Sequence, residues 1–429
     1  MPHAGRGKGI TRRTFATAGT AAALSAALPR TVPAQKSLIL NDASGLNPTP
    51  VFSHWIARTE TDSAFIERLR KELKAAAEAN RPVAVGAARH SMGGQSLPRN
   101  GSAMTFNINR CEPDRAAKAY RVHAGTRWAE VIASLDTIGF SPAVTQSNHD
   151  FGVGATFSVN AHGWPVPYGP MGSTVRAFRL MLADGTVLTC SRNENPELFR
   201  LVMGGYGLFG VILDLDVEMT ENVLLRSRFA VMPAEDFAKR FVAAESDPAV
   251  RMAYGRLNVT HSDFFSEAVL VTFHPERTPP DGLPPLRHAR LAPMLTRQVY
   301  RAQLGSERNK RARWFAETVV VPKSFTGVFT RNSLMNEPVA NLANRDPKRT
   351  DILHEYFIAP ERFNEFIQGC RSIIPKAQAD FLNVTLRYVR KDETSVLAYA
   401  TTSRIAAVMS FSLLKTAEGE ADMQRTTKR

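Results

Sequence analysis

The chain contains 429 residues, of which 44% are hydrophobic and 22% are charged. A chain of this size and composition can bury a sizeable core, so the sequence predicts a globular protein of two or three domains and excludes a disordered one. The formal net charge is +14, and the three cysteines form no CxxC pair, which excludes a disulfide framework and a cysteine zinc site.

Residues 1–34 have the pattern of an export signal. Arg12 and Arg13 precede an apolar stretch from Phe15 to Leu28, and residues 32–34 form a small-residue cleavage site. The apolar stretch is shorter than the roughly 20 residues that span a bilayer. We expect twin-arginine export, which carries folded proteins and places this one in the periplasm or outside the cell. A disordered basic tail is the alternative.

Helix and strand patterns alternate in the segment that follows. Apolar residues at helical spacing predict helices over residues 62–81, capped by Asp62 or Ser63, and over 127–139. Short apolar runs predict strands over residues 83–87, 103–108 and 119–125.

A long glycine-bearing stretch without periodicity, residues 145–173, predicts a functional loop. A β-hairpin about Asp184-Gly185, a short helix over 195–204 and a strand over 210–219 come next.

The remaining residues, 222–429, predict a second α+β domain. A Pro-rich link and a basic helix interrupt its elements. Strand patterns cover 268–273, 354–359 and 381–390, and a helical pattern covers 360–374.

Much of the positive charge lies in residues 287–313, which hold eight Lys or Arg residues and one acid. Such a helix could lie on an anionic membrane surface, but we favour a solvated helix over a domain core. No aromatic residues alternate with the arginines, and an exported protein does not meet nucleic acid, so we expect no such partner. The apolar stripe is Leu291, Leu295, Val299 and Ala302, and the basic stripe is Arg290, Arg297, Arg301 and Arg308.

Several enzyme classes lack their motifs. "GYGLFG" (205–210) has the spacing of a dinucleotide-binding fingerprint, but it follows a helix and precedes a strand, the reverse of the required order. We therefore interpret it as a tight turn into the strand. HExxH, GxSxG and P-loop motifs are missing, and the histidines have no metal-ligand spacing, so hydrolase and metalloenzyme functions lose support and we expect no metal site.

Two glycine-bearing loops remain, "GAARHSMGGQ" (86–95) and "GVGATFSVNAHG" (152–163). Glycines let backbone N–H groups converge on phosphate oxygens, and Ser, Asn and Gln add donors. These loops indicate a pyrophosphate clamp.

The chain resembles the flavoenzymes of the vanillyl-alcohol oxidase type, the FAD-linked oxidases with a PCMH-type FAD domain. "GAARHSMGGQ" is similar to their GxGHS-like loop, and "RVHAGTRWAEVIASLDTIG" to their VxAGxxWxxVxxxLxxxG-like segment. "VGATFSVNAHG" is similar to a VGGxxxxNxHG-like loop, and "ENPELFRLVMGGYGLFGVI" to an ENPDLFxxVxGGxGxFGVI-like segment. Four matches in order over residues 52–220 make the resemblance specific.

The resemblance implies an α+β fold, with a PCMH-type two-subdomain FAD-binding domain over residues 48–221 and a substrate or cap domain over 222–429. It implies FAD as the cofactor, bound by three segments. These are Gly86, Ala87, Ala88, Arg89, His90, Ser91, Met92, Gly93, Gly94 and Gln95; Gly152, Gly154, Ala155, Ser158, Asn160, His162 and Gly163; and Gly210, Val211 and Ile212.

The histidine of the first loop has a further implied role. In many relatives this histidine is bonded covalently to the 8α-methyl group of the flavin, and His90 matches it. Arg89 departs from the glycine that usually precedes it. The alternative is that His90 hydrogen-bonds the loop or phosphate without a bond to FAD.

In the second domain, "NVTLRYVRKDETSVLAYA" resembles the strand that carries a Glu-x-Arg pair in sugar-alcohol and aldonolactone oxidases. Arg387 matches the arginine, and Thr385 stands in place of the glutamate. Arg387, His162 and Tyr388 are the catalytic candidates, with His354 as a further candidate base. Relatives continue beyond the point where this sequence stops, so we also expect a truncated C-terminal end.

The resulting hypothesis is an exported FAD-dependent oxidoreductase that oxidises an alcohol carbon of a sugar, polyol or lactone by hydride transfer to flavin N5. Oxygen or a quinone-type acceptor would reoxidise the flavin. The alternatives are a truncated non-catalytic flavin-fold protein, a membrane-surface binding protein that uses residues 287–313, and a flavin reductase acting on a C=C bond.

Overall fold

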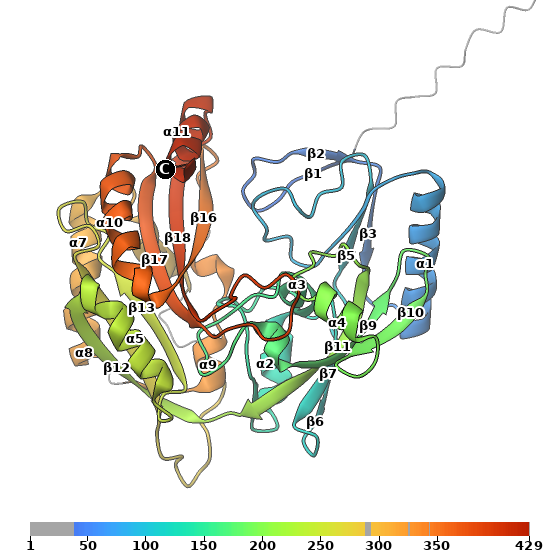
Figure 1. The fold of residues 1–429 in the computed structure, drawn as a ribbon, viewed down its shortest axis with the longest axis horizontal. Coiled ribbons are helices and arrows are strands. Elements are labelled where there is room, and N and C mark those ends of the chain that lie inside the picture. Colours follow the sequence, from blue (N-terminus) through green and yellow to red (C-terminus); the bar gives the residue numbers. More distant parts are fainter. Residues whose placement is uncertain (1–37, 288–292, 325–326, 343, 429) are drawn as a thin grey trace, which may run out of the picture. The chain divides into compact units, whose positions relative to one another are not determined.

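The computed structural model describes residues 38–428 apart from 288–292, 325–326 and 343. The predicted export signal lies outside the described residues. Helices and strands are mixed along the chain (Figure 1), which confirms the predicted α+β class.

The first subdomain is a parallel sheet with strand order β3-β5-β4, formed by β3 (Ser53–Ala57), β5 (Ser102–Phe106) and β4 (Val83–Gly86). Helix α1 (Asp62–Glu78) buries the predicted apolar face, Phe65, Leu69, Leu73 and Ala76. Its cap is Thr61 and not Asp62 or Ser63 as predicted, because the Thr61 hydroxyl accepts the Ala64 N–H. A short hairpin, β1 (Leu38–Leu40) and β2 (Thr49–Val51), precedes the sheet.

The second subdomain is a six-stranded sheet with order β10-β9-β11-β7-β6 and with β8 paired to β11. The predicted hairpin is β9 and β10, and α2 buries Trp128, Val131, Ile132 and Leu135 as its periodicity predicts. The elements are β6 (Cys111–Asp114), β7 (Ala119–His123), α2 (Trp128–Asp136), β8 (Phe140–Pro142), α3 (Val153–Ser158), β9 (Val175–Met181), β10 (Val187–Ser191), α4 (Pro196–Val202) and β11 (Val211–Glu221).

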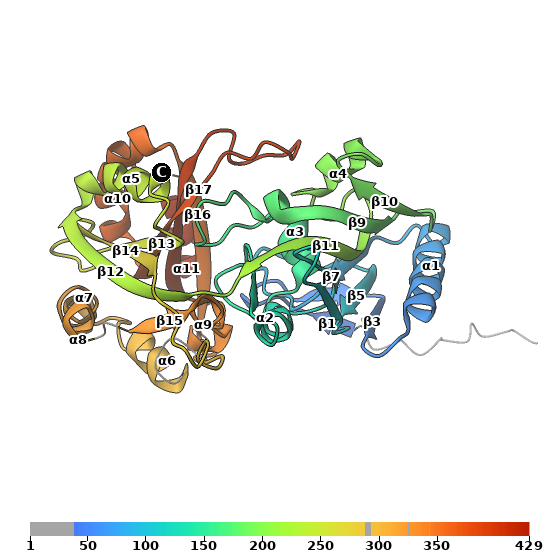
Figure 2. The same ribbon diagram turned by 90° about the horizontal axis from the view of Figure 1, so that it is seen from below.

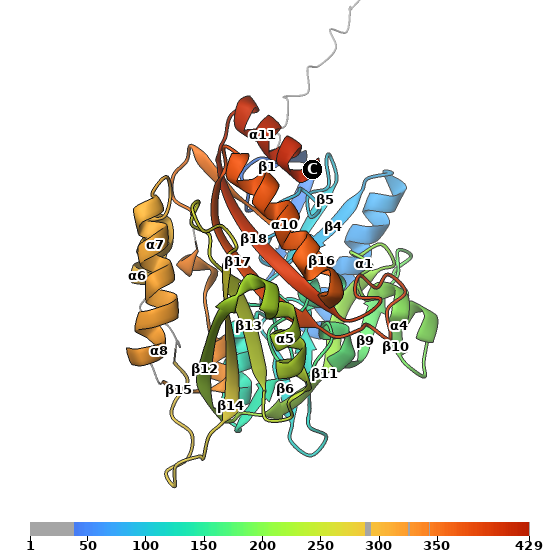
Figure 3. The same cartoon turned by 60° about the vertical axis from the view of Figure 1, so that its left-hand side comes forward.

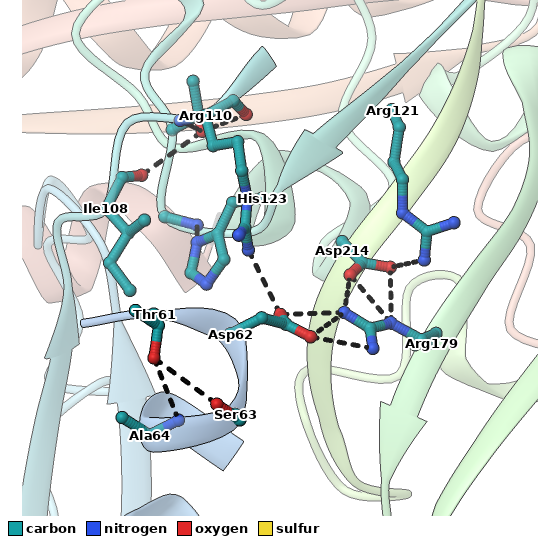
Figure 4. A network of polar contacts seen from close by, with 12 residues as sticks. Thr61, Asp62, Ser63, Ala64, Ile108, Arg110, Arg121, His123, Arg179 and Asp214 are labelled. Carbon is teal, nitrogen blue, oxygen red and sulfur yellow. Dashed lines mark hydrogen bonds and ion pairs between the residues drawn. The ribbon is translucent and has the colours of Figure 1, made fainter. Parts of the chain in front are cut away.

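A polar network joins the two subdomains (Figure 4). Arg179 of β9 lies between Asp62 of α1 and Asp214 of β11, with Nη2 of Arg179 at 3.0 Å from Oδ1 of Asp62. Arg110 also donates to Asp62, over 3.1 Å, and Arg121 donates to Asp214, over 2.9 Å. The network therefore fixes the first turn of α1 to the six-stranded sheet.

The cap is a seven-stranded sheet with order β15-β12-β14-β13-β17-β18-β16, all of whose neighbouring strands are antiparallel. Helices α5 and α10 cover one face (Figures 1 and 3), where their phenylalanines join the core of the sheet. The elements are β12 (Leu224–Pro233), α5 (Phe237–Ser246), β13 (Met252–Leu257), β14 (Glu267–Pro275), β15 (Val328–Thr330), β16 (Arg349–Ile358), α10 (Phe363–Ile373), β17 (Asp380–Val389), β18 (Arg404–Leu414) and α11 (Ala417–Lys428).

The predicted single basic helix is wrong. Gly305, with φ +61°, separates α6 (Pro293–Arg301) from α7 (Glu307–Phe315), and α8 (Val321–Ser324) follows (Figure 3). Val299 of the predicted apolar stripe is 47% exposed, whereas Arg301 and Arg313 bind Asp351 and Glu317. Arg290 and Leu291 lie outside the described residues. In the described part of the chain no helix has the length and apolarity needed to cross a bilayer.

Two cap segments contact the FAD-domain part of the chain. The loop between β17 and β18 extends toward α3 and α4 (Figure 2), where Arg200 donates to the Thr394 carbonyl oxygen over 3.1 Å. Helix α9 (Arg331–Met335) is buried, and Asn332 donates to the Phe140 carbonyl oxygen over 2.8 Å. Both segments therefore connect the cap to the six-stranded subdomain.

Candidate active site

The first glycine-bearing loop begins where β4 ends, at the carboxyl edge of the parallel sheet. The backbone N–H groups of residues 88–92 have no hydrogen-bond acceptor among the described residues. Consecutive unpaired amides in a loop are the donors that phosphate oxygens require. The loop therefore fits the pyrophosphate of FAD.

The far end of this loop is held by its own side chains and by Asp42. Gly94 donates its N–H to Oδ2 of Asp42 over 2.7 Å, and Gly93 donates to Oε1 of Gln95 over 2.9 Å. The Ser91 hydroxyl lies 3.0 Å from that of Ser96. Gly93, Gly94 and the Gln95 side chain thus shape the loop, and the free amides lie before them.

Arg89 adopts the left-handed conformation, with φ +55°, at the position where the family motif has glycine. Its guanidinium donates to Oγ1 of Thr105 and to the carbonyl oxygens of Ser96 and Met104, over 3.1, 2.7 and 3.0 Å. Burial lowers the pKa of Arg89. The side chain anchors the loop to β5 and adds a positive charge to the same loop, which favours an anionic group there.

His90 is half-buried, and its ring centroid lies 4.9 Å from that of Phe151. It borders a cavity of about 330 Å³ that Arg127, Glu130 and Asp150 also line. Burial lowers the pKa of His90, although the Asp150 carboxylate opposes the shift. The neutral imidazole, the nucleophilic form, is therefore favoured at neutral pH.

The second loop is not continuous as predicted, because residues 153–158 form α3. A Cβ atom on Gly152 would lie 2.4 Å from Cβ of Ala87, and one on Gly154 would lie 2.6 Å from Cβ of Ala124. These glycines allow the second loop to pack against the first loop and against the end of β7. Ala155 and Ser158 are part of the helix itself.

Asn160, a predicted FAD contact, holds the cap loop in place. Its amide oxygen accepts the Gly172 N–H at 2.8 Å, and its amide nitrogen donates to Oδ2 of Asp392 over 2.9 Å. Its carbonyl oxygen accepts the Tyr399 hydroxyl at 2.8 Å. Asn160 therefore connects the end of the second glycine-bearing loop, residues 152–163, to the loop between β17 and β18.

His162, next to Gly163 at the end of the second loop, meets the cap sheet. Nε2 of His162 lies 2.6 Å from Oε1 of Glu355 on β16, and Nδ1 is buried without a partner among the described residues. The rings of Phe357 and Tyr399 flank the imidazole, with centroids at 5.6 and 6.3 Å. The site thus contains an imidazole held by a carboxylate and enclosed by two aromatic rings.

Arg387 of β17 reaches the same place. It donates to the hydroxyl of Ser147 and contacts the His162 carbonyl oxygen at 3.5 Å. Burial lowers the pKa of Arg387, while Glu355 opposes this shift. For Glu355, burial disfavours ionisation, but His162 and Arg387 outweigh it, so the pKa of Glu355 lies below its ordinary value. The cluster therefore holds a carboxylate and a guanidinium around one imidazole.

The structure does not bring Tyr388 and His354 into this cluster, because side chains alternate along a strand. Tyr388 follows Arg387 and points into the cap core, with its ring 5.8 Å from that of Phe241. His354 precedes Glu355 and packs against Phe411, at 5.2 Å. Glu355 lies in no motif and was not predicted, although the alternation of "HEYFIA" places His354 and Glu355 on opposite faces.

The third predicted segment is in the six-stranded sheet. The "GYGLFG" segment forms the predicted turn, since Tyr206 and Gly207 have φ +52° and +80°, and β11 begins after it. Gly210 has φ +145°, and Val211 and Ile212 pair with β9. These residues fix the end of the turn, so an FAD contact there would be through the backbone.

Comparison with known proteins agrees with this geometry. Residues 65–191 match the family model of an FAD-binding domain. The chain is similar to cytokinin dehydrogenase 8 of Oryza sativa subsp. indica, with 30% identity over 199 residues that cover 41% of this chain and 37% of that protein. It is also similar to the mitochondrial L-galactono-1,4-lactone dehydrogenase of Brassica oleracea, with 26% identity over 177 residues that cover 41% of this chain and 29% of that protein.

The chain therefore contains an FAD-binding domain and is similar over that part to FAD-linked oxidoreductases. Its FAD-binding domain contains both glycine-bearing loops and α2, so the predicted cofactor is confirmed as FAD. The chain spans about a third of the length of the curated relatives that it matches. Cytokinin dehydrogenase 2 of Arabidopsis thaliana, 29% identical over 188 residues, matches 41% of this chain and 37% of its own length.

Proposed function

We propose that this protein is a member of the FAD-linked oxidases and an FAD-dependent oxidoreductase that oxidises an alcohol carbon of a sugar, polyol or lactone. The observation that carries the proposal is the cluster of His162, Glu355 and Arg387, which lies between the second glycine-bearing loop and the cap sheet. Oxidation of an alcohol requires a proton acceptor for the hydroxyl and a donor that orients its oxygen. The imidazole and the guanidinium supply these two groups.

The two loops supply the FAD site. The backbone N–H groups of residues 88–92 would hold the pyrophosphate, and Arg89 adds positive charge to the same loop. Bound FAD supplies a hydride acceptor. The chain's own contribution is to orient the substrate oxygen with Arg387, to receive the proton, and to exclude water with the rings of Phe357 and Tyr399.

The relatives' names point to two substrate classes, cytokinins and L-galactono-1,4-lactone. A polar group with a carboxylate and a guanidinium favours the class that carries several hydroxyl groups, because these hydroxyl groups can donate to Glu355 and accept from Arg387, which an apolar substrate cannot do. A substrate panel with L-galactono-1,4-lactone, sorbitol and isopentenyladenine, assayed with a dye acceptor, decides between them. We expect dye reduction with the lactone or the polyol. Reduction with isopentenyladenine alone would overturn the proposal.

We further propose that His90 bonds FAD covalently. The neutral, half-buried imidazole on the pyrophosphate loop supports this link. Acid precipitation of the purified protein tests it: yellow colour should stay in the pellet for the wild type and leave it for His90→Ala. Colour released from the wild type would show non-covalent FAD.

Export through residues 1–34, and oxygen or a quinone-type compound as electron acceptor, complete the proposal. A double Arg12→Lys and Arg13→Lys variant should keep the protein in the cytoplasm when cell fractions are probed with antibody. Equal export of both forms would contradict twin-arginine transport. Oxygen consumption during turnover, measured with and without a quinone, distinguishes the two acceptors.

A further inference from the structure

The two ring nitrogens of His162 have different surroundings. Nε2 lies 2.6 Å from Oε1 of Glu355, whereas Nδ1 is buried and has no partner among the described residues. A carboxylate accepts hydrogen bonds and cannot donate them, so it stabilises the neutral imidazole tautomer with its hydrogen on Nε2. The lone pair is then on Nδ1. His162 is only 6% exposed, which keeps this lone pair from bulk water.

The other titratable groups of the site are poor proton acceptors. Burial, together with Glu355 and Asp392, raises the pKa of Tyr399, and its hydroxyl already donates to the Asn160 carbonyl oxygen. Arg387 stays cationic. Glu355 has a lowered pKa, which makes its carboxylate a weak base. The His162 imidazole remains, and its Nδ1 atom has no hydrogen-bond partner among the described residues.

The carboxylate in this contact comes from β16 and not from β17. Glu355 and Thr385 both pair with Val408 of β18, from opposite sides, so all three side chains lie in one row on one face of the sheet. The Thr385 hydroxyl accepts a hydrogen bond from Arg256 over 2.9 Å. Thr385 therefore cannot replace the carboxylate, whereas the longer Glu355 side chain reaches His162.

We propose that His162 is the general base of the reaction, with Nδ1 as the accepting atom, and that Glu355 is the positioning residue that sets its tautomer. This inference rests on the proposed function. The substrate O–H proton moves to Nδ1, and the oxygen electron pair forms the C=O bond. The C–H bond breaks, and its electron pair leaves with the hydrogen as hydride, for which FAD held by the two loops would be the two-electron acceptor. The chain's own product state is a protonated His162 beside the new carbonyl compound.

The tautomer can be measured without a substrate. Nitrogen NMR of the FAD-loaded protein with ¹⁵N-labelled histidine distinguishes protonated from unprotonated ring nitrogens, and His162→Asn assigns the signal. We expect Nδ1 of His162 to be unprotonated in the wild type. In Glu355→Leu we expect the two tautomers to mix, whereas Glu355→Gln keeps an acceptor oxygen and should preserve the wild-type pattern.

The rate of flavin bleaching in rapid mixing, with L-galactono-1,4-lactone or sorbitol as the probe, tests the catalytic consequence. We expect His162→Asn to slow bleaching by about 10²-fold or more and Glu355→Leu by roughly 10-fold or more, with partial recovery in Glu355→Gln. Exposed Glu361→Gln, outside the site, serves as the control and should bleach at the wild-type rate. Equal flavin content in all variants shows that they are folded.

An unchanged tautomer or an unchanged bleaching rate in Glu355→Leu would overturn the positioning role. An unchanged rate in His162→Asn would overturn the base assignment. If neither probe bleaches the wild-type flavin and only isopentenyladenine does, the proposed function fails, and with it the hydroxyl as proton source. The NMR comparison would still decide whether Glu355 sets the tautomer of His162.

Discussion

Nη2 of Arg179 lies 3.0 Å from Oδ1 of Asp62, so the six-stranded sheet is bonded to the first turn of α1 (Figure 4). The same guanidinium binds Asp214, whose side chain is 5% exposed and which also binds Arg121. Asp214→Asn removes the buried carboxylate that the two arginines share, and leaves Arg179 with Asp62 and Arg121 with Asp216, at 3.9 Å, as their charged partners. We expect Asp214→Asn to lower the free energy of unfolding by about 1–2 kcal/mol in urea denaturation, because charge-assisted hydrogen bonds to a buried carboxylate are lost.

An exposed pair on the same sheet provides the control. Arg176 and Glu218 lie 3.4 Å apart with 42% and 47% of their side chains exposed. Water screens this pair, so Glu218→Gln should change the free energy of unfolding by less than about 0.5 kcal/mol. Equal effects of the two substitutions would show that the network does not clamp the subdomains.

His123 makes the stability of the fold depend on pH. It is 1% exposed; its Nδ1 accepts the Gly125 N–H at 3.0 Å, while its Nε2 has no partner in the described part of the chain. Burial, with a smaller contribution from Arg110, lowers the pKa of His123 to about 4. The unfolded chain has a histidine pKa of about 6.5. Because the folded pKa is the lower one, this stabilisation is present above about pH 6.5 and is lost as the pH falls toward 4.

Urea denaturation at pH 7.5 and pH 5.0 measures this loss. Between these values we expect the wild type to lose about 2 kcal/mol more than His123→Gln, which has no titrating ring. Exposed His261→Gln is the matched control and should follow the wild type. If His123→Gln loses as much stability as the wild type, another group causes the pH dependence.

Local sequence signals predicted the longer helices and strands of the FAD domain and its first loop, but not β3, β6, β8 or the helix α3 inside the second loop. Trp128 and Leu135 share a helix face because their spacing is close to two helical turns. Asp184-Gly185 forms the turn of a hairpin because this residue pair favours a tight β-turn. Gly305 shows the limit of such signals. Its left-handed conformation divides the basic segment into two helices, although the charge pattern continues across it.

The active-site group could be predicted only in part. His162 and Arg387 lie in motifs, whereas Glu355 does not, and it reaches His162 only because β16 pairs with β18 in the observed register. Tyr388 was assigned to the site for the same reason. The packing of the sheet, and not the local pattern, determines which face of β17 lies against the second glycine-bearing loop. Long-range pairing therefore determines the part of the site that the sequence does not reveal.

Gly152 should be essential for FAD binding. A Cβ atom there would lie 2.4 Å from Cβ of Ala87, so Gly152→Ala must separate the two loops. We expect a loss of about 1–3 kcal/mol in the free energy of unfolding and a lower flavin content, measured as flavin absorbance per protein. Gly369 of α10 has no atom within 4 Å of such a Cβ. Gly369→Ala should keep the flavin and stabilise the helix by about 0.5–1 kcal/mol; equal flavin loss in both would refute the steric explanation.

Arg89 combines an unfavourable backbone with favourable side-chain bonds. Its φ of +55° disfavours any residue with a Cβ atom, while its guanidinium makes three hydrogen bonds. Both Arg89→Ala and Arg89→Gly lose the bonds, but only glycine removes the backbone strain. We therefore expect the glycine variant to be more stable than the alanine variant by about 1 kcal/mol in urea denaturation. Lys74, exposed in the middle of α1, provides the control. There the alanine variant should be more stable than the glycine variant by a similar amount, because glycine disfavours a helix. An alanine variant at position 89 that equals or exceeds the glycine variant would show that the loop relaxes out of the left-handed conformation once the guanidinium no longer holds it.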